Sequence, residues 1–192
     1  MKRIPLVFLS LAPILAGCVD TPDSVSREYR NVNNEVIDSL MMTTNDATAE
    51  RMLRRIIKPS KDRYDAIDKK LASVEQNSDR KDFVKAVFES NGVHLYLTEL
   101  DVNRQRFVLE MARLRKLYKE LADAGEECPA LKELVADEST LDHVRKQLTD
   151  PNLLKTMKNF KKWKLSEYPE LLEKFMERRK VFQLKEKLDL VN

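Results

Sequence analysis

Apolar residues recur every three or four positions through most of this chain, and that spacing constrains the fold more than any other feature. On an α-helix of about 3.6 residues per turn, residues spaced in this way form one buried stripe. The clearest stripe lies between the glycines at positions 92 and 125 and consists of Leu100, Phe107, Met111, Leu114, Tyr118 and Leu121. No segment of the sequence shows the sustained two-residue alternation of a half-buried strand. We therefore expect an all-α protein.

Composition agrees with long helices that face solvent. Charged residues make up 35% of the 192 positions, hydrophobic residues make up 42%, and there are only three glycines. This balance favours a helical bundle over turn-rich β structure or disorder. We expect long antiparallel helical hairpins over residues 25–125 and a cluster of shorter helices over residues 126–192.

Turn and cap residues divide the expected helices. Pro59 predicts a helix end near Lys58, because the residue before a proline is pushed out of the helical region, and Ser60 would cap the next helix. Ser90-Asn91-Gly92 predicts a turn with its glycine in the left-handed conformation, and Gly125 predicts the end of the longest helix. A 3-4-3 spacing like that of a coiled-coil seam connects Tyr64, Ile67, Leu71 and Val74, over two heptads only.

The first 17 residues differ in character from the rest. Lys2 and Arg3 give a positive start, and residues 4–14 are apolar except for Ser10 and two prolines. This stretch is shorter than the ~20 residues that a membrane-spanning helix needs. It predicts a cleaved export signal. Without Lys2 and Arg3 the chain has 33 basic and 32 acidic residues, so no general attraction to nucleic acid is expected.

The residues Leu15-Ala16-Gly17-Cys18 closely resemble the lipobox of bacterial lipoproteins. The resemblance implies a diacylglyceryl group on the Cys18 thiol, cleavage after Gly17, and often acylation of the new amine. Two or three acyl chains hold a protein on a membrane, at ~0.8 kcal/mol per buried methylene. The alternative is an ordinary cleaved signal beside which a cysteine happens to stand. The expected organisation is a signal peptide over residues 1–17, a lipidated N-terminus and spacer over 18–24, and an all-α domain over 25–192.

The resemblance to a lipobox also implies a location: the protein would reside in the cell envelope, anchored by lipid. In diderm bacteria an Asp directly after the lipidated Cys favours retention in the inner membrane. Here that residue is Val19. The outer membrane, facing the periplasm, is therefore favoured if the organism is a diderm.

Two histidines are the first candidates for acid-base or metal chemistry. A carboxylate-bridged di-iron bundle needs a Glu three residues before each His, but Asn91 precedes His94 and Thr140 precedes His143 at that spacing. The zinc-protease pattern His-Glu-x-x-His is also absent from the sequence. We therefore expect neither histidine to bind a metal or to act in catalysis.

Cys128 is a further candidate for chemistry, as a reactive thiol. A helix start would lower the pKa of its thiol, whereas the neighbouring Glu126 and Glu127 would repel a thiolate. With Cys18 consumed by lipid there is no second cysteine for an intramolecular disulfide, so Cys128 is either a packed thiol or a contact between molecules. The glycines are isolated, so no phosphate-binding loop is expected, and no cofactor is predicted.

Basic residues cluster in two places. Around the aromatic residues Phe160 and Trp163 lie Lys155, Lys158, Lys161, Lys162 and Lys164. They are candidates for contact with anionic lipid headgroups or an acidic polymer, and the alternative is a solvated face over buried aromatic side chains. The second cluster lies on the longest helix, where we expect it to face acidic stretches of neighbouring helices: Arg104, Arg106, Arg113, Arg115, Lys116 and Lys119.

These features favour a non-catalytic role. We expect a membrane-tethered helical module that binds another protein of the envelope, or acts as a scaffold or assembly factor. Two alternatives stay open. A lipid or hydrophobic-ligand carrier would need a sizeable apolar void in the bundle, and an enzyme would need polar residues that converge only in the fold. Beyond the lipobox, the sequence resembles no family that would narrow this choice.

Overall fold

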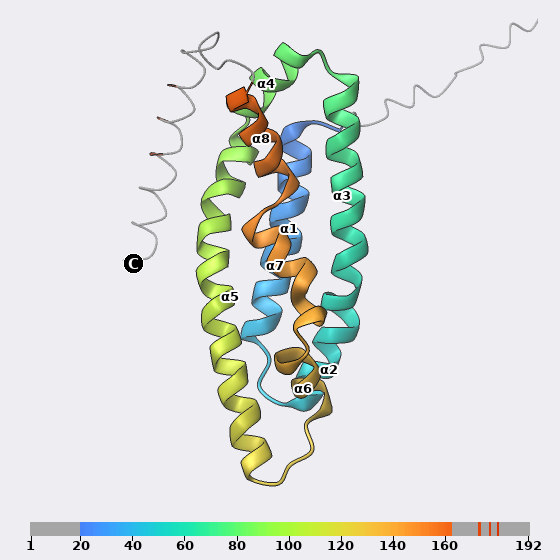
Figure 1. The fold of residues 1–192 in the computed structure, drawn as a ribbon, viewed down its shortest axis with the longest axis vertical. Coiled ribbons are helices and arrows are strands. Elements are labelled where there is room, and N and C mark those ends of the chain that lie inside the picture. The colour runs from blue at the N-terminus through green and yellow to red at the C-terminus, as the bar shows by residue number, and fades with distance from the viewer. Residues whose placement is uncertain (1–19, 163–172, 174–176, 178–179, 181–192) are drawn as a thin grey trace, which may run out of the picture.

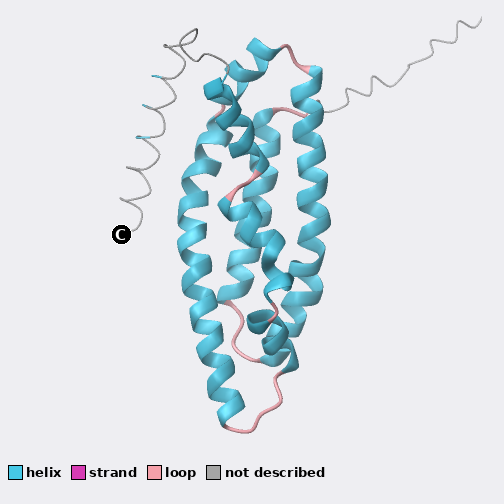
Figure 2. Cartoon of the chain, viewed as in Figure 1, coloured by secondary structure: helices cyan, strands magenta, loops and turns pink. Residues whose placement is uncertain are grey.

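The chain is an all-α helical bundle, as the sequence predicts. The computed structural model describes residues 20–162 together with residues 173, 177 and 180, and over these residues it contains helices and loops and no strand (Figure 2). Three long helices run along the bundle: α1 (Pro22–Met41), α3 (Lys58–Asn77) and α5 (Asn91–Asp123). None of the helices in this part of the chain is long and apolar enough to cross a membrane.

Shorter helices complete the bundle, in agreement with the predicted C-terminal cluster. After α5 the chain returns along the long helices through α6 (Pro129–Ala136), the 3₁₀ turn η2 (Glu138–Leu141), α7 (Asp142–Thr149) and α8 (Asn152–Lys162) (Figure 1). Helix α4 (Arg80–Glu89) lies at the end where α1 and α5 begin, and α2 (Asp46–Met52) lies towards the other end. The end of α8 is therefore at the same end of the bundle as the start of α1.

The apolar stripes of the three long helices form the core. Their buried members, each at most 8% exposed, are Val25, Tyr29, Val32, Val36 and Leu40 on α1, Tyr64, Ile67, Leu71 and Val74 on α3, and Leu100, Phe107, Met111 and Leu114 on α5. Full burial of one large apolar side chain contributes about 1.5–3 kcal/mol. Packing of these stripes is thus the main source of stability. The last two residues of the predicted α5 stripe, Tyr118 and Leu121, are only partly buried.

Helix α1 begins earlier than expected. The Thr21 hydroxyl accepts a hydrogen bond from the Ser24 amide at 3.1 Å, and the Ser24 hydroxyl accepts one from the Thr21 amide at 2.9 Å. This capping box, with Pro22 at the first helical position, fixes the start three residues before Val25. The predicted spacer over residues 18–24 therefore includes the first turn of α1.

The predicted helix end at Lys58 is wrong. Helices α2 and α3 are continuous through a π-helical turn, η1 (Leu53–Ile57), in which the Lys58 amide donates to the carbonyl of Leu53. Lys58 keeps helical angles, φ −61° and ψ −45°, although Pro59 follows it. The wider turn accommodates a proline that has no amide to donate. Ser60 is not a cap, because its hydroxyl donates to the Ile57 carbonyl at 2.7 Å.

The predicted left-handed turn at Gly92 is also wrong. Gly92 is the second residue of α5, which Ser90 caps by accepting a hydrogen bond from the Val93 amide at 3.0 Å. An Asp23 carboxylate oxygen accepts hydrogen bonds from the Gly92 amide and the Ser90 hydroxyl, both at 2.8 Å. A Cβ atom at position 92 would lie 2.6 Å from that oxygen, so glycine permits the close approach of α1. Gly125, with φ +80°, follows α5 as predicted.

Candidate functional site

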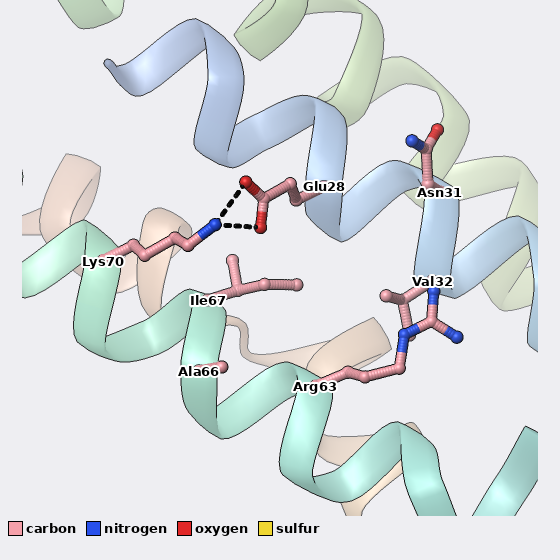
Figure 3. Close-up of a pocket in the computed structure, with 7 residues that line it drawn as sticks. All are labelled: Glu28, Asn31, Val32, Arg63, Ala66, Ile67 and Lys70. Atoms are coloured by element: carbon pink, nitrogen blue, oxygen red, sulfur yellow. Dashed lines mark hydrogen bonds and ion pairs between the residues drawn. The ribbon is translucent and has the colours of Figure 1, made fainter. Parts of the chain in front are cut away.

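Polar side chains line a groove at the surface between α1 and α3 (Figure 3). It has a volume of about 210 Å³ and is lined by Glu28, Asn31, Val32, Arg63, Ala66, Ile67 and Lys70. Lys70 Nζ lies 2.7 and 2.9 Å from the two carboxylate oxygens of Glu28, and this contact raises the pKa of Lys70. Arg63 pairs with Glu35 of α1 at 2.5 Å. The charges of this groove therefore join the two helices, and exposed pairs of this kind contribute ~0.2–1 kcal/mol each.

Three tyrosines gather in the core between α1, α3 and α5. The Tyr29 hydroxyl donates to the Asp68 carboxylate, and the Tyr64 hydroxyl donates to the amide oxygen of Asn33 at 2.8 Å. The rings of Tyr29 and Tyr96 lie 5.7 Å apart, centre to centre. Burial raises the pKa of all three phenols, so they stay neutral at physiological pH. The sequence places Tyr64 in an apolar 3-4-3 pattern but does not reveal the partner of its hydroxyl.

Helix α7 is held on α3 by two polar side chains. Gln147 donates to the second carboxylate oxygen of Asp68 at 3.3 Å. His143 Nε2 donates to the Ile57 carbonyl at 3.0 Å and lies 2.8 Å from the Ser60 hydroxyl, beside the π turn. Burial lowers the pKa of His143, which keeps the ring neutral at neutral pH. His143 is thus a contact between helices.

The other two candidates for chemistry are also packed inside the bundle. His94, fully buried near the start of α5, donates from Nε2 to the Phe88 carbonyl at 3.0 Å. Cys128 is 7% exposed at the start of α6, and burial, with a smaller effect of Asp46 and Glu126, raises the pKa of its thiol. The starts of α5 and α6 lie near opposite ends of the bundle, with α7 between them (Figure 1). Among the residues that the structure describes, no group of three or more His, Cys, Asp or Glu is placed to hold a metal ion.

The structure describes only a small part of the predicted membrane contacts, which are the lysines around Phe160 and Trp163 and the lipidation site. Lys155 Nζ lies 3.4 Å from an Asp150 carboxylate oxygen and 3.4 Å from the side-chain oxygen of Asn152, so it has local partners at the start of α8. The side chains of Lys158, Lys161 and Lys162 on α8 are not described, and Lys164 and Cys18 lie outside the described residues.

Two arginines of α5 cap the ends of neighbouring helices. Arg113 donates to the carbonyls of Leu40 at 2.7 Å and Thr43 at 2.9 Å, at the end of α1. Arg104 donates to the carbonyl of Thr149 at 3.0 Å, at the end of α7. We expected both arginines to face acidic stretches of other helices, but their acidic partners, Asp101 and Glu110, lie on α5 itself. The unpaired carbonyls at a helix C-terminus and its negative dipole end explain this placement.

A second hollow lies at the corner between the end of α1 and the helix that follows. It has a volume of about 350 Å³, and we name it the Met–Arg hollow after its residues: Ser39, Met42, Thr43, Thr48, Arg51, Met52, Arg55 and Ile56. Thr43 and Met52 form a buried floor, in which the Thr43 hydroxyl donates to the Ser39 carbonyl at 2.9 Å and lies 3.3 Å from the Met52 sulfur. Met42 is 75% exposed, and both arginines are exposed. The hollow therefore offers apolar surface beside positive charge.

The Met–Arg hollow is not apparent from the sequence. Its residues come from two helices on either side of a turn, and none of them belongs to a recognised motif. The available signal was the pair Met41-Met42, of which Met42 stands beyond the end of the α1 stripe, followed by the basic residues Arg51, Arg54 and Arg55. Only the fold brings these two segments together.

The hollows described above, of about 210 and 350 Å³, are open to solvent. Pockets for small ligands are typically ~300–1,000 Å³, so the Met–Arg hollow is at the small end of that range. Comparison of the chain with known protein families, with curated proteins and with solved structures finds no match.

Proposed function

We propose that this chain is a membrane-tethered helical lipoprotein of a bacterial envelope, with a non-catalytic binding or scaffolding role. The observation that supports this role best is that both histidines and Cys128, the candidates for chemistry, are occupied by contacts within the fold. His143 and His94 donate to main-chain carbonyls, and Cys128 is packed at a helix start. Their present contacts hold helices together, which favours a protein that acts through its surface.

The start of the described fold supports the tether. Thr21, the cap of α1, comes three residues after Cys18, so a lipid on Cys18 would hold the bundle against the membrane with very little spacer. The end of α8 lies at that same end of the bundle (Figure 1). Helix α8 would then lie at the end of the bundle that faces this bilayer. We propose the cell envelope as the location, and the outer membrane if the organism is a diderm.

Mass spectrometry of the mature N-terminus tests the tether. We expect residues 1–17 to be removed and Cys18 to be the first residue, with two or three acyl chains attached. A Cys18→Ser variant should lose the acyl chains and leave the membrane fraction, whereas the matched variant Cys128→Ser should keep both. An unmodified Cys18, or an N-terminus at another residue, would contradict the proposal.

A further inference from the structure

The Met–Arg hollow combines exposed apolar surface with two arginines, Arg51 and Arg55, that are not part of an ion pair in the described part of the chain. Met42 and the partly buried Ile56 supply the apolar surface. Arg51 and Arg55 line the same hollow one helical turn apart. No carboxylate is among the eight residues that line it. An occupant that complements this surface is both apolar and negatively charged.

The corner that carries the hollow is held rigidly. Arg113 fixes the carbonyls at the end of α1, and a reciprocal capping box between Asn45 and Thr48 fixes the start of α2. Arg55 and Ile56 belong to the π turn, a feature that occurs frequently at functional sites. A surface that is already ordered loses little conformational entropy when a partner binds, so more of the contact energy appears as affinity.

We propose that the Met–Arg hollow docks an acidic segment of a protein partner, with carboxylates flanking one apolar anchor side chain. The anchor packs on Met42 and Ile56, and the carboxylates pair with Arg51 and Arg55. Methionine side chains adapt to differently shaped apolar groups, and guanidinium groups bind carboxylates through two parallel hydrogen bonds. This inference rests on the proposed function, in which the chain binds another envelope component.

The position of the hollow argues for a protein rather than a lipid as occupant. Helix α1 has 20 residues, which corresponds to ~30 Å at ~1.5 Å per residue. The hollow is at the end of α1, whereas the proposed anchor is at its start. Headgroups of the anchoring membrane are therefore at the wrong end of the bundle. A segment of another envelope protein has no such restriction.

The chain also has an acidic segment of its own, beyond the end of α8. Four glutamates alternate there with apolar residues, at positions 167, 170, 173 and 177. This segment follows α8, which ends at the opposite end of the bundle from the hollow. We therefore assign the hollow to a separate molecule.

Photocrosslinking in cells tests this assignment on the full chain. A photoreactive phenylalanine derivative replaces Met42, and light should then produce one dominant adduct. Arg51→Glu/Arg55→Glu should reduce its yield at least tenfold by reversing the charge at the hollow. The matched control is Lys81→Glu/Lys85→Glu, which makes the same charge change at the same spacing on α4, at the other end of the bundle. Circular dichroism of both variants checks that the helices are intact.

The chemistry of the captured peptide decides the outcome. A partner peptide with carboxylates around an apolar residue, lost on Arg51→Glu/Arg55→Glu and kept in the α4 control, supports the proposal. The absence of an adduct, equal yields in both variants, a basic peptide, or an adduct to residues 163–192 of this chain overturns it. Acylation of Cys18 is measured on the same samples. Acylated protein without a charge-dependent adduct rejects only the docking site, whereas a missing acyl group rejects the tether.

Discussion

At the scale of single residues, Gly92 owes its importance to a contact with a residue 69 positions away in the chain. We predict that Gly92→Ala lowers the free energy of unfolding by about 1 kcal/mol. The new methyl group displaces the Asp23 carboxylate and breaks its hydrogen bonds, at a cost of ~1–3 kcal/mol, which exceeds the gain of ~1 kcal/mol from alanine in a helix. Urea denaturation followed by circular dichroism measures the difference.

The control for Gly92 is the same substitution in a chain that lacks the Asp23 carboxylate. In an Asp23→Ala background, Gly92→Ala should destabilise the chain less than in the parent, because the contact with the carboxylate is gone and only the Ser26 hydroxyl, 2.9 Å from the new methyl group, must still shift. A Gly92→Ala chain that is more stable than the parent would show that Asp23 moves aside without loss, and would refute the explanation given for this glycine.

His143 makes the stability depend on pH. Burial lowers its pKa in the folded state, whereas in the unfolded chain the pKa is ~6.5. The unfolded state therefore binds a proton more readily, so this contribution is fully present above ~pH 6.5 and is lost as pH falls from there through the folded pKa. We predict a lower urea midpoint at pH 5.5 than at pH 7.5.

A variant with a neutral donor isolates the effect of His143. His143→Gln retains an N–H group that can reach the Ile57 carbonyl but does not titrate. The decrease in urea midpoint between pH 7.5 and pH 5.5 should be smaller in this variant than in the parent chain. An equal decrease in both chains would mean that another group causes it.

At the scale of helices, the end of α1 depends on a side chain from α5. Arg113 reaches the carbonyls of Leu40 and Thr43, and hydrogen bonds to a charged donor contribute about 1.5–3 kcal/mol. We predict that Arg113→Ala destabilises the chain by about 2 kcal/mol. Arg113→Lys should recover only part of this, because an ammonium group cannot reproduce the planar fork of the guanidinium. Full recovery by lysine would show that charge alone matters; hydrogen exchange at the end of α1 reports the local effect.

Helix positions follow from the sequence where they depend on local apolar spacing, as in α1, α3 and α5. The predicted turn at Gly92 and the predicted helix end before Pro59 were wrong because a partner far away in the chain changes the local backbone conformation. Gly92 has the sequence context of a turn, yet Asp23 from α1 completes the cap of α5 there. Pro59 has the context of a helix end, yet the π turn before it and His143 on Ile57 support a continuous helix. Local spacing contains no information about such partners.

The candidate site was less predictable than the fold. Lipidation of Cys18 stays a prediction, and it comes from a motif, because the enzymes that modify bacterial lipoproteins recognise a short linear sequence. The Met–Arg hollow depends instead on the angle at which two helices meet across a turn. Met42 and Arg55 are 13 positions apart, and their types alone indicate only an exposed apolar residue and an exposed charge. Surface complementarity of this kind requires the three-dimensional structure.

At the scale of the whole molecule, the end of α8 and the start of α1 lie at the same end of the bundle, so the proposed lysine contact and the proposed anchor would act on one membrane. We predict that Lys158→Ala/Lys161→Ala/Lys162→Ala weakens binding to vesicles containing phosphatidylglycerol by up to ~100-fold, at ~1 kcal/mol for each lysine near the surface. Using the Cys18→Ser background removes the contribution of the acyl chains. Binding should be weak for both chains on vesicles of phosphatidylcholine alone. Equal binding of both chains to anionic vesicles would show that these lysines are simply solvated.

The contact between Asp23 and the start of α5 has a mechanical consequence for a tethered protein. Asp23 comes five residues after Cys18, and its carboxylate joins the first turns of α1 and α5. If Cys18 carries the proposed lipid, a pull on that lipid would be shared between two helices along their axes instead of acting on α1 alone. A load from a moving partner at the far end would then be transmitted through the length of the bundle to the bilayer.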